Sequence, residues 1–310
     1  MKMRYCLLIG SVLGSLLAGT ADGRADSGDL PQGAQKRVDD AYRRRNFTFS
    51  DFGRDYGEFK NYLNREYGFD YSFDVSYMPQ RGAPNGRKTA YQTLISPSFT
   101  WTAFNNEYGT GTLNFAYTVA RYGGSQAARI GGNIGAVTEI NDYDDKSNAF
   151  NELYYSYQAG GSWKWLTVAA GQFPLSNFDG TAYDSNQQVN FINYALSQNA
   201  SSTYSTAGGG AYLQATPNSE WTFAVGAQDA TNVDGISVRF NNLNEEHYAT
   251  FGYIAYSPTI KGLGAGQYSV LLYNQPWVEE QKQTTNGWSV NLSQAIGDKL
   301  TVFGRCLLYT

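Results

Sequence analysis

Cysteine and histidine are nearly absent from this chain, which has two cysteines and one histidine in 310 residues. Cys6 lies in an N-terminal segment that we expect to be removed on export, and Cys306 then has no partner for an intramolecular disulfide. The fold must therefore be held by backbone pairing and burial rather than by cross-links. The lone His247 leaves most metal and acid–base chemistry without a residue to perform it. The net charge of -4 gives no reason to expect a nucleic-acid partner.

Long apolar runs are scarce as well. The single clear run covers residues 5–18, follows the basic stretch 1–4, and precedes small residues suited to a cleavage site. This order is typical of a secretory signal peptide, which we place at residues 1–25. The run is shorter than the ~20 residues that a membrane-spanning helix needs. We expect an exported chain without a transmembrane helix.

Aromatic residues and glycine are abundant: 25 Tyr, 17 Phe, 6 Trp and 34 Gly, with a mean hydropathy of -0.45. A membrane β-barrel combines these properties, because its apolar outer face alternates with a polar lumen and aromatic residues line its rims. A two-domain soluble protein of this length stays open on composition alone.

Residues of alternating polarity decide between these classes. In residues 69–77 aromatic or aliphatic side chains alternate with Asp and Ser, and the same period of two returns in 113–120 and 221–228. Strict alternation predicts strands with one polar face. The template gives about eleven strands. They cover residues 69–78, 90–104, 111–121, 150–158, 163–172, 206–215, 221–229, 248–257, 267–275, 286–295 and 299–304.

Short and long connections alternate along these strands. Tight turns at 105–110, 159–162, 216–220 and 296–298 take turns with polar loops at 122–149, 173–205, 230–247 and 276–285. Outer-membrane barrels have short periplasmic turns and long external loops. Amphipathic aromatic residues should then form a girdle near the short turns. The candidates are Trp101, Tyr155, Tyr157, Trp163, Trp165, Tyr212, Trp221 and Tyr256.

The segment 26–68 differs from the rest, because apolar residues in 51–67 recur at helical spacing. We expect a short amphipathic helix there, in the periplasm or in the barrel mouth. A second helix is possible where Val189, Ile192 and Leu196 recur on one face. The barrel itself should occupy residues 69–310.

Several motifs resemble the carbohydrate-selective porin family, the OprB type of outer-membrane porin. They are the segments 151–155, 163–165, 170–173 with Asp179, 211–217, 221–227, 287–292, 297–300 and 302–305. The resemblance implies a water-filled channel for passive diffusion of carbohydrates and other small polar solutes, located in the bacterial outer membrane and narrowed by an inward-folded loop. It implies about sixteen strands ending in an aromatic residue.

Solute contact needs hydrogen-bonding groups and aromatic rings on the polar face. The candidate residues of the lumen or constriction are Glu152, Tyr154, Ser156, Gln158, Gln172, Asn177 and Asp179. The alternative is that they only keep the lumen wet. We expect small polar solutes, sugars among them, and outer-membrane lipid as partners, with no cofactor. The oligomeric state does not follow from the sequence.

Three features of the sequence allow a specific functional interpretation as well as a plain structural one. His247 between acidic neighbours could serve an outer-membrane hydrolase, but no nucleophile motif accompanies it. The run 141–145 is acidic but lacks the spacing of a calcium loop. Gly208 to Gly210 lack the Lys of a phosphate-binding loop and suit a bend or close packing. We expect a porin and not an enzyme, with a non-conducting barrel of adhesive or structural role as the alternative.

An odd number of strands cannot close an outer-membrane barrel, because bacterial single-chain barrels have an even number. The alternation should also break after Arg305, in residues 306–310. We therefore expect a C-terminally truncated porin whose curved sheet has a gap between its first and last strands.

Overall fold

A computed structural model describes residues 49–83, 88–136, 140, 141, 143, 147–181, 191–199, 202–233, 235–238 and 247–309. The predicted signal peptide lies outside the described residues. The chain divides into two compact units, Met1–Asp70 and Tyr71–Thr310. In the described part of the chain, no helix is both long and apolar enough to cross a membrane.

The described part of the first unit is mainly one helix, α3 (Phe49–Tyr67). The helix ends where Gly68 adopts a left-handed backbone with φ of 65° and its N–H donates to the Asn64 carbonyl at 2.9 Å. Glycine adopts this conformation without the steric cost that a side chain would bring. The helix predicted over residues 51–67 is confirmed.

The second unit is an antiparallel sheet of twelve strands. The strands are β1 (Phe69–Arg81), β2 (Thr89–Asn106), β3 (Gly109–Gly124), β4 (Ser147–Ala159), β5 (Leu166–Phe173), β6 (Gly208–Ala215), β7 (Trp221–Asp229), β8 (Tyr248–Tyr256), β9 (Thr259–Ile260), β10 (Gly264–Gln275), β11 (Thr285–Ile296) and β12 (Leu300–Tyr309). The eleven predicted strands are all present. The two-residue β9 lies between the predicted strands 248–257 and 267–275.

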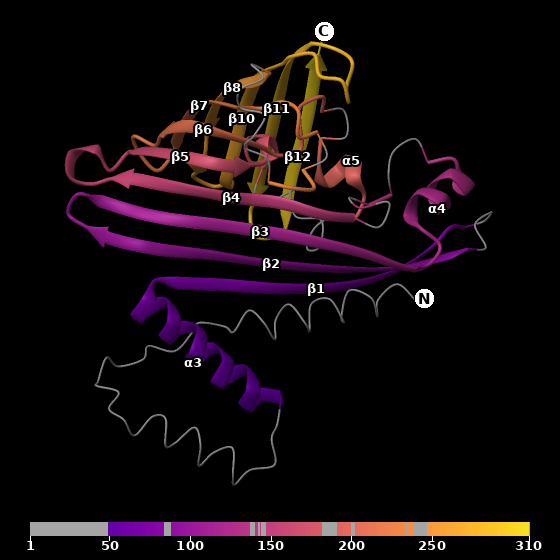
Figure 1. Ribbon diagram of the computed structural model, residues 1–310, viewed down its shortest axis with the longest axis horizontal. Coiled ribbons are helices and arrows are strands. Elements are labelled where there is room, and N and C mark those ends of the chain that lie inside the picture. Colours follow the sequence, from indigo (N-terminus) through magenta and orange to yellow (C-terminus); the bar gives the residue numbers. More distant parts are fainter. Residues whose placement is uncertain are drawn as a thin grey trace. The chain divides into compact units, whose positions relative to one another are not determined.

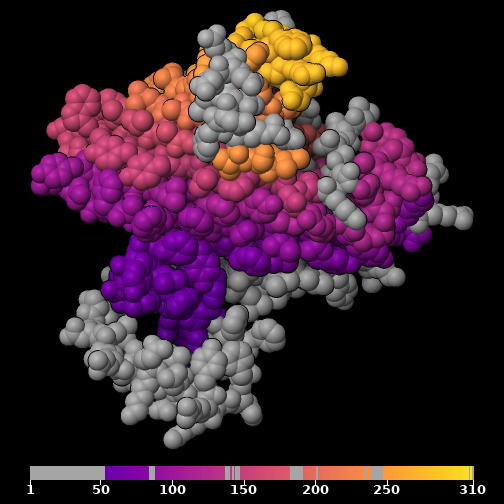
Figure 2. Space-filling model, viewed as in Figure 1, coloured from indigo at the N-terminus to yellow at the C-terminus, as the bar shows by residue number. Residues whose placement is uncertain are grey.

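Neighbours in the chain are neighbours in the sheet, from β1 through β8, β10 and β11 to β12 (Figure 1). The short β9 pairs with β10. In the space-filling view the colours of the sheet follow the sequence from magenta through orange to yellow (Figure 2). In the described residues no ladder joins β1 to β12, so the sheet is open, as predicted. The alternation of polarity breaks after Arg305, as expected, but β12 continues through this segment and its pairing with β11 extends as far as Tyr309 and Gly287.

The two faces of the sheet differ as the alternation predicts. We call outer face the one that carries exposed bulky apolar side chains. They include Val168, Leu213, Val225, Ile254, Leu272, Leu292 and Val302. The register places these residues on one side of the sheet, since Leu213 pairs with both Val168 and Val225. The opposite, inner face carries buried polar residues, among them Ser269, Ser289 and Asn291.

The connections alternate in length, as predicted. Residues 107–108 join β2 to β3, whereas residues 174–207 join β5 to β6. The long connections at one end contain α4 (Ala127–Ile134), between β3 and β4, and α5 (Tyr194–Ser197), between β5 and β6. The Asn193 side chain caps α5 by accepting from the Ala195 N–H at 3.1 Å. Of the predicted second helix, Ile192 precedes α5, Leu196 lies in it, and Val189 falls outside the described residues.

Aromatic residues cluster near the short turns on the outer face. The rings of Trp163 and Trp165 are 5.5 Å apart, and Trp221 stacks on Tyr256 with ring centroids at 4.6 Å. Tyr212 does not belong to this girdle. It pairs with Ala169 and Gly226 and packs on the inner face. The prediction for Tyr212 was wrong because the strand places Leu213, not Tyr212, on the outer face.

Gly226 on β7 provides a test of inner-face packing. A Cβ atom there would lie 2.6 Å from the Tyr212 Cβ and 2.7 Å from the Ala211 backbone oxygen. Gly226→Ala should destabilise the folded protein by about 1–3 kcal/mol, because the neighbouring backbone must shift. Gly252→Ala is the matched control, since nothing lies within 4 Å of that position. Urea unfolding in detergent, followed by gel mobility, should show a lower midpoint for the first variant only; equal midpoints would contradict this packing.

Candidate functional site

The connection between β5 and β6 folds onto the inner face of the sheet. Directly after β5, the short helix η2 (Leu175–Phe178) buries Leu175 and Phe178 against side chains of β7, β8 and β10. The Phe178 ring lies 4.8 Å from the Phe251 ring and 5.3 Å from the Tyr212 ring, between ring centroids. Apolar burial thus fixes the start of this connection against the wall.

Asp179, the next residue, is 2% exposed and accepts four hydrogen bonds. One carboxylate oxygen accepts from the Ser289 hydroxyl at 2.5 Å and from the Asn291 amide at 2.9 Å. The other accepts from the Asn199 amide at 2.8 Å and from the Tyr204 hydroxyl at 2.7 Å. A buried carboxylate is stable when several donors surround it. Asp179 therefore joins two distant parts of the connection to β11.

Tyr204 remains a donor in this arrangement. Burial and, next, the Asp179 carboxylate raise the pKa of Tyr204 well above its usual range, so the hydroxyl keeps its proton. Its ring packs edge-on against Tyr273 of β10, with ring centroids 5.2 Å apart. Neighbouring Thr203 forms hydrogen bonds with the Tyr273 hydroxyl at 3.0 Å and with the Thr285 hydroxyl at 2.9 Å. The end of the connection is thus fixed as firmly as its start.

The predicted residues of β4 lie on the inner face. Tyr154 pairs with Gly171 and Ser156 with Ala169, on the same side as Glu152 and Gln158. Glu152 accepts a hydrogen bond from the exposed Asn177 amide at 2.7 Å. The structure therefore brings Glu152, Asn177 and Asp179 together around η2, with Glu152 and Asn177 partly open to solvent and Asp179 enclosed.

Gln172 lies on the other face. It pairs with Leu153 and Gly209, in the same row as Val168 and Leu213, so its expected inward position was wrong. Its side chain is nevertheless buried, because the connection between β7 and β8 covers it. The Gln172 amide donates to the Phe150 carbonyl at 2.6 Å, and the Asn232 amide reaches the Gln172 side-chain oxygen at 3.3 Å. A polar residue on the outer face is tolerated where a loop satisfies it.

One buried polar group escaped the sequence analysis. The Gln92 amide donates to the Tyr122 hydroxyl at 2.7 Å and to Asn141 at 3.2 Å, and Asn141 in turn donates to Gln80 at 2.7 Å. Asn141 thus has a structural role, whereas Asp142, Asp144 and Asp145 of the acidic run lie outside the described residues. The alternation of β2 places Gln92 on the inner face. Its hydrogen-bond partners lie tens of residues away in the sequence, so no local pattern predicts them.

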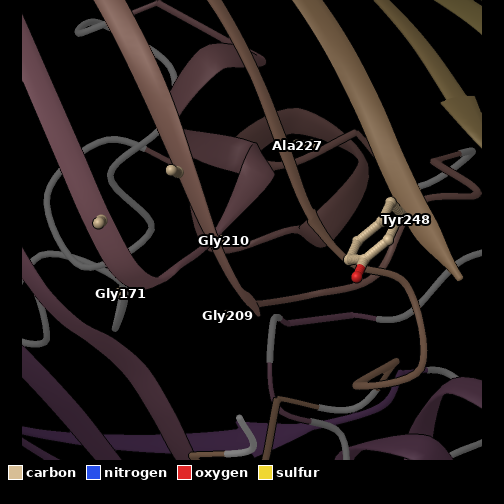
Figure 3. A pocket seen from close by; sticks show the side chains of 7 residues that line it. Gly171, Gly209, Gly210, Ala227 and Tyr248 are labelled. Atoms are coloured by element: carbon tan, nitrogen blue, oxygen red, sulfur yellow. The ribbon is translucent and has the colours of Figure 1, made fainter. Parts of the chain in front are cut away.

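A depression of about 490 Å³ lies elsewhere on the wall (Figure 3). Its lining consists of Ala170, Gly171, Gly209, Gly210, Ala211, Ala227 and Tyr248. Ala211 and Ala227 pair with each other in the row that continues through Leu213 and Val225, so the depression opens on the outer face. Gly208 and Gly210 serve close packing: a Cβ at Gly210 would lie 2.1 Å from the Ala227 oxygen, and one at Gly208 would lie 2.4 Å from the Asp229 oxygen. The depression is separate from the residues around Glu152.

Metal chemistry finds no support in the described part of the chain, where no three His, Cys, Asp or Glu side chains come close enough to hold an ion. The backbone carbonyl of His247 accepts a hydrogen bond from the Ala230 N–H at 2.9 Å.

Asp179→Asn should release the connection between β5 and β6. The substitution turns one acceptor into a donor that faces buried donors, and each unsatisfied buried group costs roughly 1–3 kcal/mol. Protease cleavage within residues 174–207 should rise at least about tenfold, since 1.4 kcal/mol of local stability corresponds to that factor. Asn177→Ala, which removes one exposed hydrogen bond, is the control. Equal cleavage in both variants would show that Asp179 does not hold the connection.

Known proteins resemble this chain in sequence and in fold. No family model matches the chain. The porin AaxA of Chlamydia abortus is 39% identical over 254 residues, which are 79% of this chain and 56% of that protein. The porin AaxA of Chlamydia pneumoniae is 41% identical over 243 residues, 76% of this chain and 55% of that protein. The chain thus spans a little over half the length of these curated relatives.

A solved structure gives the same picture of the fold. The high-pH structure of Pseudomonas putida OprB superposes with a TM-score of 0.62, covering 83% of this chain and 70% of that chain at 13% sequence identity. At that identity the likeness concerns the fold alone. Both AaxA relatives are named porins, which gives the hydrolase interpretation of His247 no support. The chain is a homologue of the chlamydial AaxA porins and has the fold of an OprB-type porin.

Proposed function

We propose that this protein forms the wall and constriction of an outer-membrane channel for passive diffusion of small polar solutes. The observation that carries the proposal is the inward fold of the connection between β5 and β6, fixed to β11 through Asp179. A loop fixed across the inner face narrows a lumen without closing it. The exposed apolar outer face suits lipid, and the short turns would face the periplasm.

Carbohydrates are the solutes that we propose. Sugars bind through planar polar groups and through stacking of their apolar faces on aromatic rings. The residues beside the constriction supply both, with the Glu152 carboxylate, the Asn177 amide and the rings of Tyr154 and Tyr212, whose centroids are 6.3 Å apart. The family resemblance of the sequence points to the same class. Gln172 leaves the proposed set because it faces away from the lumen.

One observation favours a second function, that of a non-conducting barrel. The inner face between β5 and β10 is occupied by an apolar cluster that includes Phe173, Phe178, Phe251 and Tyr273. Such packing fills lumen volume that a wide pore would leave to water. A barrel of structural or adhesive role would tolerate this filling.

Conductance separates the two functions. The purified protein reconstituted in planar bilayers should pass ions in discrete steps, and proteoliposomes should swell in isosmotic sugar at rates that fall with sugar size. Charged amino acids of similar mass serve as the comparison for selectivity. Folded protein that gives neither current nor swelling would establish the non-conducting barrel instead, and swelling with amino acids but not with sugars would remove the carbohydrate class.

Glu152→Gln tests the constriction directly. Glu152 is a partly exposed carboxylate on the inner face, and charges that line a pore set the field in it. Removing this charge should lower the preference for cations over anions, measured as a shift of the reversal potential in a salt gradient. Ser156→Ala, on the same face of β4, should leave the reversal potential unchanged. Identical potentials for wild type and Glu152→Gln would remove Glu152 from the solute path.

A further inference from the structure

The helix α3 carries a narrow apolar stripe that the channel function does not use. Tyr56, Phe59 and Leu63 follow one another at spacings of three and four residues. This is the spacing of the two core positions of a coiled-coil heptad. A helix that packs on a globular core has a wider apolar face, with a third position per heptad. The stripe of α3 therefore fits another helix better than a flat wall.

The stripe is partly open in this chain. Phe59 is 53% exposed, and Tyr62 at its border is 42% exposed.

The charges beside the stripe specify which helix fits. With Tyr56 and Leu63 at one core position of the heptad and Phe59 at the other, Asp55 and Lys60 lie on opposite borders. In a parallel pair of identical helices, Asp55 of each faces Lys60 of the other, five residues further on, and the charges are opposite. An antiparallel pair would place Lys60 near Lys60. The pattern thus favours the same helix from a second copy, in parallel.

We propose that α3 pairs in parallel with α3 of a second copy of this chain along Tyr56, Phe59 and Leu63. A helix of 19 residues is too short for a strong association by itself. Anchoring in one membrane raises the effective concentration of the helices and favours the pairing. Lys60 contacts Asp70 at 3.0 Å and Asp55 contacts Arg54 at 3.2 Å within the chain, but exposed ion pairs of this kind are weak and exchange readily.

Cysteine cross-linking of the full chain tests the seam, with Cys6 and Cys306 replaced by serine. Phe59→Cys and, independently, Leu63→Cys should form interchain disulfides in detergent micelles and in proteoliposomes under mild oxidation. Glu58→Cys, on the opposite side of the helix, is the matched control and should stay monomeric. Gel mobility before and after heating reports that each variant is folded. Folded variants in which neither seam position cross-links more than position 58 would overturn the proposal.

Charge reversal tests the direction of the pair. In the Phe59→Cys background, Asp55→Lys or Lys60→Asp alone should slow cross-linking roughly two- to fivefold, and the two together should restore it, because the facing charges are again opposite. Asp70→Asn, which breaks only the pair within the chain, should not slow it. If the double variant does not regain the cross-linking rate, the parallel pairing is overturned. Protection of α3 by lipid vesicles without interchain cross-links would assign the stripe to the membrane surface instead.

Discussion

The structure depends on one constraint: in the membrane interior, each backbone N–H and C=O must find a partner in the protein, because lipid offers none. A continuous antiparallel ladder meets this requirement from β1 to β12. The same ladder forces successive side chains to opposite faces, so one row of side chains lies on the outer face and the next on the inner face. The alternation of aromatic and polar residues that runs through the sequence is a direct result of this geometry.

The inner face poses the opposite problem, because its polar groups must stay satisfied where loops exclude water. Asp179 solves this with four donors from two parts of the chain, and the Gln92 amide nitrogen donates to Tyr122 and Asn141. Phe178 packs in the apolar cluster, and the next residue, Asp179, forms buried hydrogen bonds. Burial of the Phe178 side chain therefore also positions the Asp179 carboxylate. The inward-folded connection is thus fixed by neighbours in sequence that satisfy different physical requirements.

Most of the wall could be predicted from sequence because period two is a local signal that survives in each strand. Glu152, Tyr154 and Ser156 were placed on the correct face by parity alone. Gln172 was misplaced because parity was read from polarity, and a loop from β7 to β8 makes a polar residue acceptable on the outer face. Asp179 was singled out, but its partners could not be, since Ser289 lies 110 positions away and strand contacts of that range leave no local trace.

The Asp179 contacts also bear on the shape of the sheet. The connection leaves β5, crosses the inner face and is held at β11, five ladders further along the strand order β5-β6-β7-β8-β10-β11. Asn291 extends the link to β12 by accepting from the Arg305 guanidinium at 2.9 Å. A tie between distant strands on the concave side resists flattening, because opening the sheet would stretch hydrogen bonds to a buried carboxylate. The connection that folds onto the inner face therefore also holds the curvature of the sheet.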